Sequence, residues 1–204
     1  MKTYTIVKKQ GDLDWSKVPV ATLEPIVQEG LSLDIEASAQ LCYDDENLYV
    51  HLSAKENPIR AEHTGPLDSV CEDSCLEFFF SPMYGDDRYF NIEYNPNGCV
   101  YLGFAENLQK LIRLVPEFGI PFDPKVEMTE DGWNITYHIP YEFVRRFYPE
   151  FNPTSGTKMR GNFYKCADLS PKVHYLWWNP MSLEPLSYHK PKEFGEFIFE
   201  SCKA

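Results

Sequence analysis

The feature that most constrains the fold is a strongly alternating segment at residues 69–82, which reads SVCEDSCLEFFFSP. Its apolar residues at alternate positions are Leu76, Phe78 and Phe80, and the positions between them hold Cys75, Glu77 and Phe79. Alternation with a period of two in an aromatic-rich segment is typical of a half-buried β-strand. Glu77 therefore points away from the apolar side. Because a carboxylate that is buried without a partner is costly, we expect Glu77 to face water or a polar concavity.

Two more alternating segments follow at residues 89–94 and 100–104, and the sequence NPNG at 95–98 is a strong turn signal between them. Three consecutive strands at hairpin spacing predict an antiparallel meander. One of its faces would be apolar. The other would carry hydrogen-bonding groups and rings, namely Tyr89, Asn91, Glu93 and Tyr101 together with Glu77. A polar and aromatic sheet face suits a ligand with many hydroxyl groups and apolar patches, as a sugar has.

The rest of the sequence also favours short strands. Aromatic residues make up 15% of the 204 residues, and 16 Pro and 11 Gly indicate many turns, so we expect an all-β fold. Alternation predicts hairpins at 37–53 and 125–139, and Pro140 precedes one short helix at 141–148. Because no internal repeat or linker divides the chain, we assign residues 1–204 to a single domain.

The charge and the hydrophobic pattern argue against several classes of partner. A net charge of −12 disfavours nucleic acid and anionic membranes, whose phosphates require clustered Lys and Arg. No segment reaches transmembrane length, and the amino terminus lacks the apolar segment of a signal peptide. We therefore expect a cytoplasmic protein from the sequence as given, or an extracellular one if a signal peptide has been removed.

Six cysteines occur at irregular spacings, at positions 42, 71, 75, 99, 166 and 202. A chain of this length does not need disulfides. Neither a His nor a further Cys lies at zinc-finger spacing around Cys71 and Cys75. We interpret the cysteines as reduced thiols and expect no metal site.

The chain resembles carbohydrate-binding module family 9 and its wider group of family-9-like domains over nearly its whole length. The resemblance is carried by the order and spacing of DDENLYVHL (44–52), VCEDSCLEFFFSP (70–82), RYFNIEYNPNG (88–98), DGWNITYHIP (131–140), RGNFYKCAD (160–168), LWWNP (176–180) and KEFGEFIF (192–199). It implies an antiparallel β-sandwich. In characterised members two Trp rings clamp the terminal sugars of a glucan or xylan chain, and Glu, Arg, Gln and Asn side chains supply hydrogen bonds.

The resemblance also assigns site residues by position. The second clamp Trp matches Trp178, with Trp177 as the alternative registration, and the central Glu matches Glu77. Asn91 stands where the sugar binder has Arg, and Lys165 stands near the Gln position. The resemblance thus implies a carbohydrate ligand held by these side chains.

One position departs from the family pattern. The first clamp Trp is expected just before the EDS sequence, where this chain has Cys71, and a thiol offers no stacking face. Family members also often carry structural calcium, but no ligand set in this sequence is clear enough to transfer it. We expect no other cofactor.

Three functions remain open from the sequence. The first is non-catalytic sugar binding, with Trp178 as the platform and Glu77, Asn91 and Lys165 as hydrogen-bonding groups. The second is an enzyme acting on sugars, with Glu77 and Glu93 as an acid/base pair, since carboxyl groups on one face of a hairpin could approach the ~5–9 Å separation that glycosidases use. The third is a protein-interaction module whose sugar site has decayed, which the missing first Trp favours. We expect the first.

Overall fold

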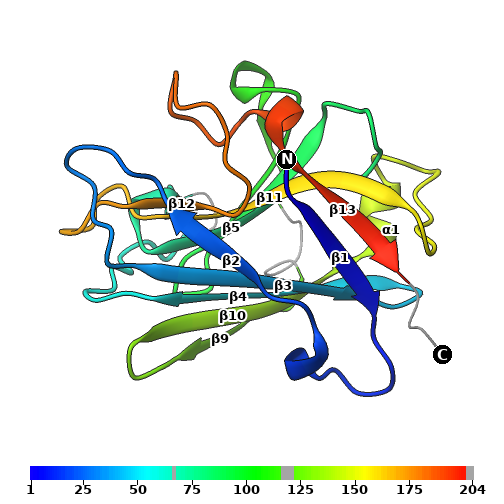
Figure 1. Cartoon of the computed structure of the whole chain (residues 1–204), viewed down its shortest axis with the longest axis horizontal. Helices are drawn as coiled ribbons and strands as arrows, with labels where there is room; N and C mark the ends of the chain where they lie inside the picture. Colours follow the sequence, from blue (N-terminus) through cyan, green and yellow to red (C-terminus); the bar gives the residue numbers. More distant parts are fainter. Residues whose placement is uncertain (66–67, 116–121, 201–204) are drawn as a thin grey trace.

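The computed structural model describes residues 1–65, 68–115 and 122–200, which form a mostly β architecture with one short α-helix (Figure 1). The strands are β1 (Thr3–Lys8), β2 (Ala21–Pro25), β3 (Glu36–Tyr43), β4 (Asn47–Lys55), β5 (Cys75–Ser81), β6 (Tyr89–Tyr94), β7 (Val100–Ala105), β8 (Ile112–Arg113), β9 (Lys125–Met128), β10 (Gly132–Pro140), β11 (Lys158–Cys166), β12 (Tyr175–Trp177) and β13 (Gly195–Glu200). The helix is α1 (Tyr141–Arg145), and short 3-10 turns lie at Trp15–Lys17, Val70–Glu72, Leu108–Lys110 and Pro191–Glu193.

The strands form one continuous sheet that folds back on itself into two layers. One layer holds β9, β10, β4, β3 and β2 in that order, and the other holds β12, β11, β5, β6, β7 and β8. Figure 1 shows β3, β4, β10 and β9 running together below β5 and β11. β12 pairs with β2 where the layers join, and β1 pairs in parallel with both β3 and β13. The predicted antiparallel β-sandwich with one short helix is confirmed, with β1 as the parallel exception.

The apolar faces of the two layers pack together as the main core. Phe78 of β5 stacks on Phe163 of β11 with ring centroids 5.0 Å apart. Tyr94 of β6 contacts Tyr137 of β10 in the opposite layer, also at 5.0 Å. A fully buried Phe side chain stabilises a fold by roughly 1.5–3 kcal/mol, so these alternating aromatic residues supply much of the free energy that holds the layers together.

The predicted local elements are largely confirmed. β5, β6 and β7 form the expected meander, and β3–β4 and β9–β10 form the expected hairpins. The helix is shorter than predicted. The amides of Arg146 and Phe147 donate hydrogen bonds to the carbonyls three residues earlier. The α-helix therefore ends at Arg145, and a tighter turn follows it before Pro149.

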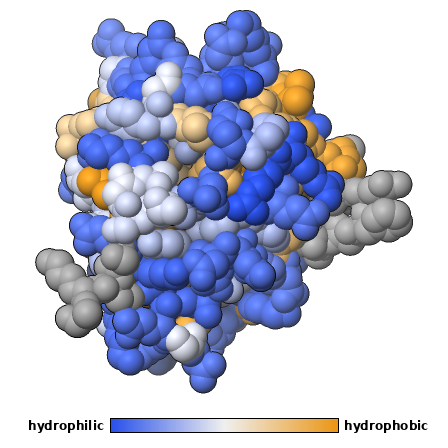
Figure 2. Space-filling view, turned by 90° about the vertical axis from the view of Figure 1, so that its right-hand side faces the viewer, coloured by the Kyte–Doolittle hydropathy of each residue, from blue (hydrophilic) through white to orange (hydrophobic). Residues whose placement is uncertain are grey.

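The described surface is polar on the side shown in Figure 2, where hydrophilic residues predominate and apolar ones gather in a few areas. Among the described residues, no helix is both long and apolar enough to cross a membrane. Cys42, Cys71, Cys75, Cys99 and Cys166 are free thiols. The sixth cysteine, Cys202, lies outside the described residues.

The outer face of the second layer is covered rather than open. The segment between β12 and β13, orange in Figure 1, lies over it. Tyr188 of this segment stacks on Tyr164 of β11 with ring centroids 3.9 Å apart, and Nδ1 of His189 lies 2.7 Å from the hydroxyl of Tyr89 on β6. The covering segment therefore encloses the polar face that carries Glu77.

Candidate functional site

A row of side chains crosses five strands on the covered face. In register these are Tyr101 of β7, Glu93 of β6, Glu77 of β5, Tyr164 of β11 and Trp177 of β12. Side chains directly opposite each other on antiparallel strands have Cβ atoms about 4.5–5.5 Å apart. The row therefore brings two carboxyl groups together between aromatic rings.

Glu77 is only 2% exposed. Its Oε1 atom accepts a hydrogen bond from the thiol of Cys166 at 2.9 Å. The pKa of Glu77 is raised to about 8, mainly by burial. The hydrogen bond from Cys166 lowers this pKa, and the nearby carboxyl of Asp168 raises it. Glu77 is thus a largely protonated acid at neutral pH, able both to donate and to accept a hydrogen bond.

Glu93 is 7% exposed and faces Glu77 across β5 and β6. Burial, and then the neighbouring Glu77, raise its pKa well above the ordinary value. The side-chain amide of Asn91 donates to Oε1 of Glu93 at 2.7 Å, while Oδ1 of Asn91 is buried and has no hydrogen-bond partner among the described residues. A Cβ added at Gly103, directly opposite Asn91, would lie 2.2 Å from that Oδ1 atom, so only glycine leaves room there.

A cavity of about 270 Å³ opens over this row. Its lining residues are Cys71, Glu77, Glu93, Cys166, Asp168, Tyr175, Leu186, Ser187, Tyr188 and His189. The strands supply the floor, and the 186–189 segment supplies one wall. Its volume is near the lower limit of small-molecule sites, roughly 300 Å³, which fits one sugar ring better than an extended chain.

The aromatic wall of the cavity is held rigidly. One face of Tyr188 is covered by the Tyr164 ring, and its edge meets Tyr175 at 82° with centroids 6.2 Å apart. The single hydroxyl proton of Tyr188 is shared between the carbonyls of Lys165 and Leu176, whose oxygens lie 3.1 and 3.2 Å from the hydroxyl oxygen. Because both the ring and the hydroxyl are fixed, Tyr188 presents a preformed surface to the cavity.

His189 adds a polar group that is neutral at ordinary pH. Burial lowers the pKa of this imidazole to about 4. Its Nδ1 atom contacts the hydroxyl of Tyr89. Asp168, which also lines the cavity, has a pKa that burial raises above its usual value, although hydrogen bonds with Tyr175 and Cys71 oppose the effect. The cavity therefore combines a neutral imidazole and carboxyl groups of raised pKa with aromatic surfaces.

The structure brings several of the sequence-predicted residues to this face. Glu77 and Cys71 line the cavity, and Asn91 supports Glu93 beside it. Trp177 lies on the same side of the sheet, opposite Tyr164 in register, but its ring is buried in a small apolar cluster. The alternative registration, Trp177, is thus the Trp that shares a face with Glu77.

Trp178 lies on the other side of the sheet, which corrects its expected place as a platform. It is 5% exposed, and its ring stacks on Phe197 with centroids 5.2 Å apart and meets Tyr4 edge-on at 6.1 Å. Adjacent residues in an extended segment point to opposite faces, so once Trp177 faces the covered side, Trp178 must enter the core.

Lys165 also lies away from the cavity and is fully buried between the layers. Its Nζ atom is 3.1 Å from Oε2 of Glu56, 2.8 Å from Nε2 of His174 and 2.9 Å from the carbonyl of Cys166. These contacts account for all three ammonium hydrogens. Lys165 therefore bridges the layers and does not reach the cavity.

The sequence reasoning did not single out Asp168, Tyr175, Tyr188 and His189 as site residues. Tyr175 could have been predicted from the sequence, because alternation along Tyr175–Trp177 places it on the same face as Trp177. Tyr188 and His189 belong to a segment without periodicity, and only their contacts with Tyr164 and Tyr89 place them.

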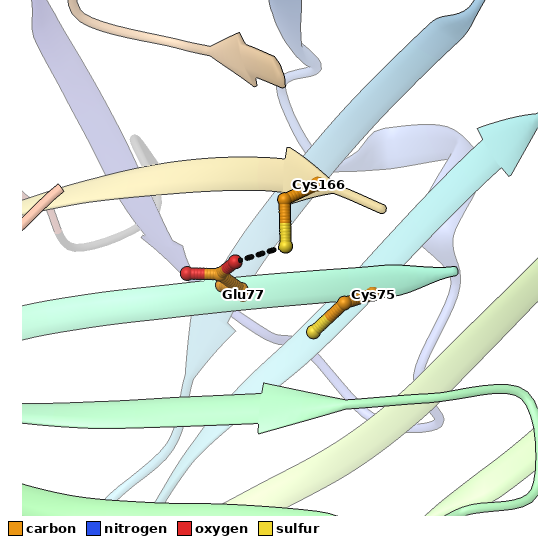
Figure 3. Close-up of side chains that lie close together, drawn as sticks. All are labelled: Cys75, Glu77 and Cys166. Atoms are coloured by element: carbon orange, nitrogen blue, oxygen red, sulfur yellow. Dashed lines mark hydrogen bonds between the residues drawn. The ribbon is translucent and has the colours of Figure 1, made fainter. Parts of the chain in front are cut away.

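One group within the described residues has the composition of a metal site. Figure 3 shows Cys75 and Glu77 on β5 beside Cys166 on β11, with the Cys166 thiol directed at the Glu77 carboxyl. One ligand atom from each residue lies within 4.8 Å of the other two, and all three residues are buried.

Comparisons with known proteins agree with this architecture. The chain superposes on the crystal structure of a candidate carbohydrate-binding protein from Bacteroides uniformis with a TM-score of 0.84 and 26% identity, over 98% of this chain and 99% of that chain. Two structures of a family 9 carbohydrate-binding module from Caldicellulosiruptor kristjanssonii each give a TM-score of 0.70 at 15% identity. The complex with glucose aligns over 99% of this chain and 97% of that chain. The complex with cellotriose aligns over 99% of this chain and 95% of that chain.

Sequence comparisons give the family directly. No curated protein matches the chain significantly. The profile of carbohydrate-binding family 9 matches residues 8–199, which includes β2 to β12 in full, the last residue of β1 and all but the last residue of β13. This chain belongs to carbohydrate-binding family 9.

Proposed function

We propose that this chain binds a sugar without acting on it chemically, and that the cavity over Glu77 and Glu93 holds a single sugar ring. The observation that carries the proposal is the combination of Tyr175 and Tyr188 with three carboxyl groups around one small cavity. Aromatic rings cover the apolar faces of a sugar, and convergent polar groups bind its hydroxyls. The glucose and cellotriose complexes of the Caldicellulosiruptor module support this ligand class.

The state of the carboxyl groups favours a polyhydroxylated, neutral ligand. Glu77 and Glu93 hold their protons because burial raises the pKa of both groups. A protonated carboxyl offers one donor and one or more acceptors, which matches a sugar hydroxyl. Asp168 has a raised pKa as well. A sugar that carries a carboxylate or sulfate would meet acidic groups on several sides and should bind less well.

The same pKa values argue for binding over glycoside hydrolysis. Both glycosidase mechanisms need one protonated acid and one ionised carboxylate at the working pH. Here burial favours the neutral form of both Glu77 and Glu93.

The site is also a poor match for a protein-interaction module, which binds through an exposed surface. Glu77 and Glu93 both lie below the surface, at the floor of the cavity.

Calorimetric titration with a panel of neutral and acidic mono- and oligosaccharides tests the proposal. Tyr188→Ala and Glu77→Gln should abolish or strongly weaken the binding of any sugar that the wild-type protein binds. Their matched controls are Tyr84→Ala, which removes an exposed ring, and Glu36→Gln, which removes an exposed carboxylate. Both controls should bind as the wild-type protein does.

A chromatographic assay of the overnight mixtures should detect no new product. Titrations in the presence of EDTA keep sugar binding separate from metal binding. The absence of heat with every sugar, or equal affinities in Tyr188→Ala and Tyr84→Ala, would refute the proposed site.

A further inference from the structure

The cluster of Cys75, Cys166 and Glu77 is not explained by sugar binding alone. Cys75 and Glu77 are two residues apart on β5 and therefore share a face, and Cys166 is directly opposite Cys75 on β11. Cys75 is completely buried beneath the cavity, while Cys166 and Glu77 line it. The three side chains thus lie close together (Figure 3), and two of them border the cavity.

The distances already approach those of a coordination sphere. The Cys166 sulfur and Oε1 of Glu77 are 2.9 Å apart, and the ligand atoms of all three residues lie within 4.8 Å of one another. A tetrahedral zinc ion has ligands at about 2.0–2.3 Å, so neighbouring ligand atoms are separated by somewhat less than twice that length. Small side-chain rotations would bring these atoms around one ion.

The donor set selects the class of metal. Two thiols with one carboxyl favour a thiophilic ion such as zinc. Calcium instead requires six to eight oxygen ligands, and magnesium requires octahedral oxygen coordination. A cluster of this composition therefore discriminates against calcium and magnesium.

Acidic groups and two cations, Lys165 and Arg113, surround the cluster, and Arg113 acts electrostatically on Glu93. Glu93 and Asp168 border the same cavity. The ammonium of Lys165 points to the other face of β11, where Glu56 neutralises it. The thiolate is the form of cysteine that binds a metal, so both thiols must give up their protons to coordinate one. Binding of a dication would release these protons to solvent and compensate the buried negative charge that follows.

We propose that Cys75, Cys166 and Glu77 bind one zinc-class ion at the floor of the cavity. Three protein ligands leave a fourth tetrahedral position, and because Cys166 and Glu77 line the cavity, that position faces its interior, where a water molecule or a ligand hydroxyl can occupy it. The metal site does not depend on the proposed sugar function.

The test is a zinc titration of the reduced, EDTA-stripped full chain, followed by competition with a chromogenic chelator and without any sugar. The wild-type protein should bind one equivalent. Loss of a residue that merely supports a metal ligand weakens binding by about 10–100-fold, so Cys75→Ser and Cys166→Ser should each weaken it by more than about 100-fold. Cys42→Ser, which alters an equally buried thiol on β3, is the matched control and should bind as the wild-type protein does.

A second readout uses the unaltered protein, in case the serine variants fold poorly. Cobalt(II) added in place of zinc should give a thiolate-to-metal charge-transfer band and the intense visible absorption of a tetrahedral site. Absence of the charge-transfer band would overturn the proposal. So would wild-type zinc affinity in Cys75→Ser, or an equal loss of affinity in Cys42→Ser.

Discussion

The ammonium of Lys165 on β11 lies 3.1 Å from the carboxylate of Glu56, which directly follows β4, and both side chains are fully buried. The pair joins the two layers of the sandwich close behind the cavity. Glu56 also accepts hydrogen bonds from the indole of Trp133 at 2.8 Å and from the hydroxyl of Ser74 at 2.9 Å. Both oxygens of Glu56 thus have hydrogen-bond partners, which is the condition for a buried ion pair to be tolerated.

Glu56→Ala should destabilise the protein by about 3–5 kcal/mol, because it leaves the charge of Lys165 buried without its counterion. The control is Glu36→Ala, since Glu36 pairs with the exposed Lys55 at 3.7 Å, and such exposed pairs contribute about 0–1 kcal/mol. Urea unfolding of the two variants measures the difference. Equal stabilities would mean that the other contacts of Lys165 suffice to compensate its charge.

His174 should make the stability depend on pH in the weakly acidic range. Its Nδ1 lies 2.7 Å from the carbonyl of Lys172, which can only accept, so Nδ1 carries the proton and Nε2 accepts from Lys165. Burial, and then the charge of Lys165, lower the pKa of His174 from 6.5 to about 4. The unfolded chain therefore binds a proton more readily than the folded one between these pH values.

This contribution to stability is complete above pH 6.5 and is lost progressively as the pH falls towards about 4. Its full size is about 3 kcal/mol, since one pKa unit corresponds to about 1.4 kcal/mol. His174→Gln removes the titrating group, so the free energy of unfolding of the variant should fall less steeply between pH 7 and pH 4.5. Parallel pH profiles for the wild-type protein and the variant would contradict the assignment.

Trp178 should matter for stability and not for sugar contact. Its ring fills the core between Tyr4, Phe163 and Phe197, and truncation of such a buried aromatic residue to Ala costs about 3–5 kcal/mol. Trp178→Phe keeps part of that packing. We expect it to lower the melting temperature while the calorimetric sugar affinity stays at the wild-type value. A strong loss of affinity in a folded Trp178→Phe protein would return Trp178 to the binding site.

The sequence predicts the parts of this molecule that depend on local alternation. The meander, the hairpins and the shared face of Glu77, Asn91 and Glu93 follow from period-two patterns and from turns such as 95–98, because a hairpin turn also sets the register of the strands it joins. The family resemblance extends these elements to a sandwich, and the family match confirms it.

Contacts between residues that are distant in the sequence determine the features of the site that the sequence did not predict. Two adjacent Trp residues must face opposite ways, but only the pairing of β12 with β11 determines that Trp177 takes the covered side. Lys165 shares a face with the apolar Phe163, and a lysine is rarely buried without a partner. Its partner, Glu56, is distant in sequence. The thiol cluster likewise needs Cys166 beside Cys75, which short-range cysteine spacing cannot reveal.

The contact between Gly103 and Asn91 offers a last test of how the carboxyl pair is positioned. A methyl group at residue 103 would collide with Oδ1 of Asn91, and overpacking of this kind costs about 1–3 kcal/mol. Gly103→Ala should therefore destabilise the protein. It should also weaken sugar binding, because the displaced Asn91 can no longer hold Glu93 through its 2.7 Å hydrogen bond.

A double-mutant cycle separates the collision from other effects of the added methyl group. Asn91→Ala removes the obstructing oxygen, so Gly103→Ala should cost less stability in that background than in the wild-type protein, by about 0.5–3 kcal/mol as for other residues in direct contact. Sugar affinity should not recover in the double variant, because Glu93 still lacks its amide donor. Strictly additive stabilities would show that the two residues do not interact, and recovery of affinity would show that Glu93 needs no support from Asn91.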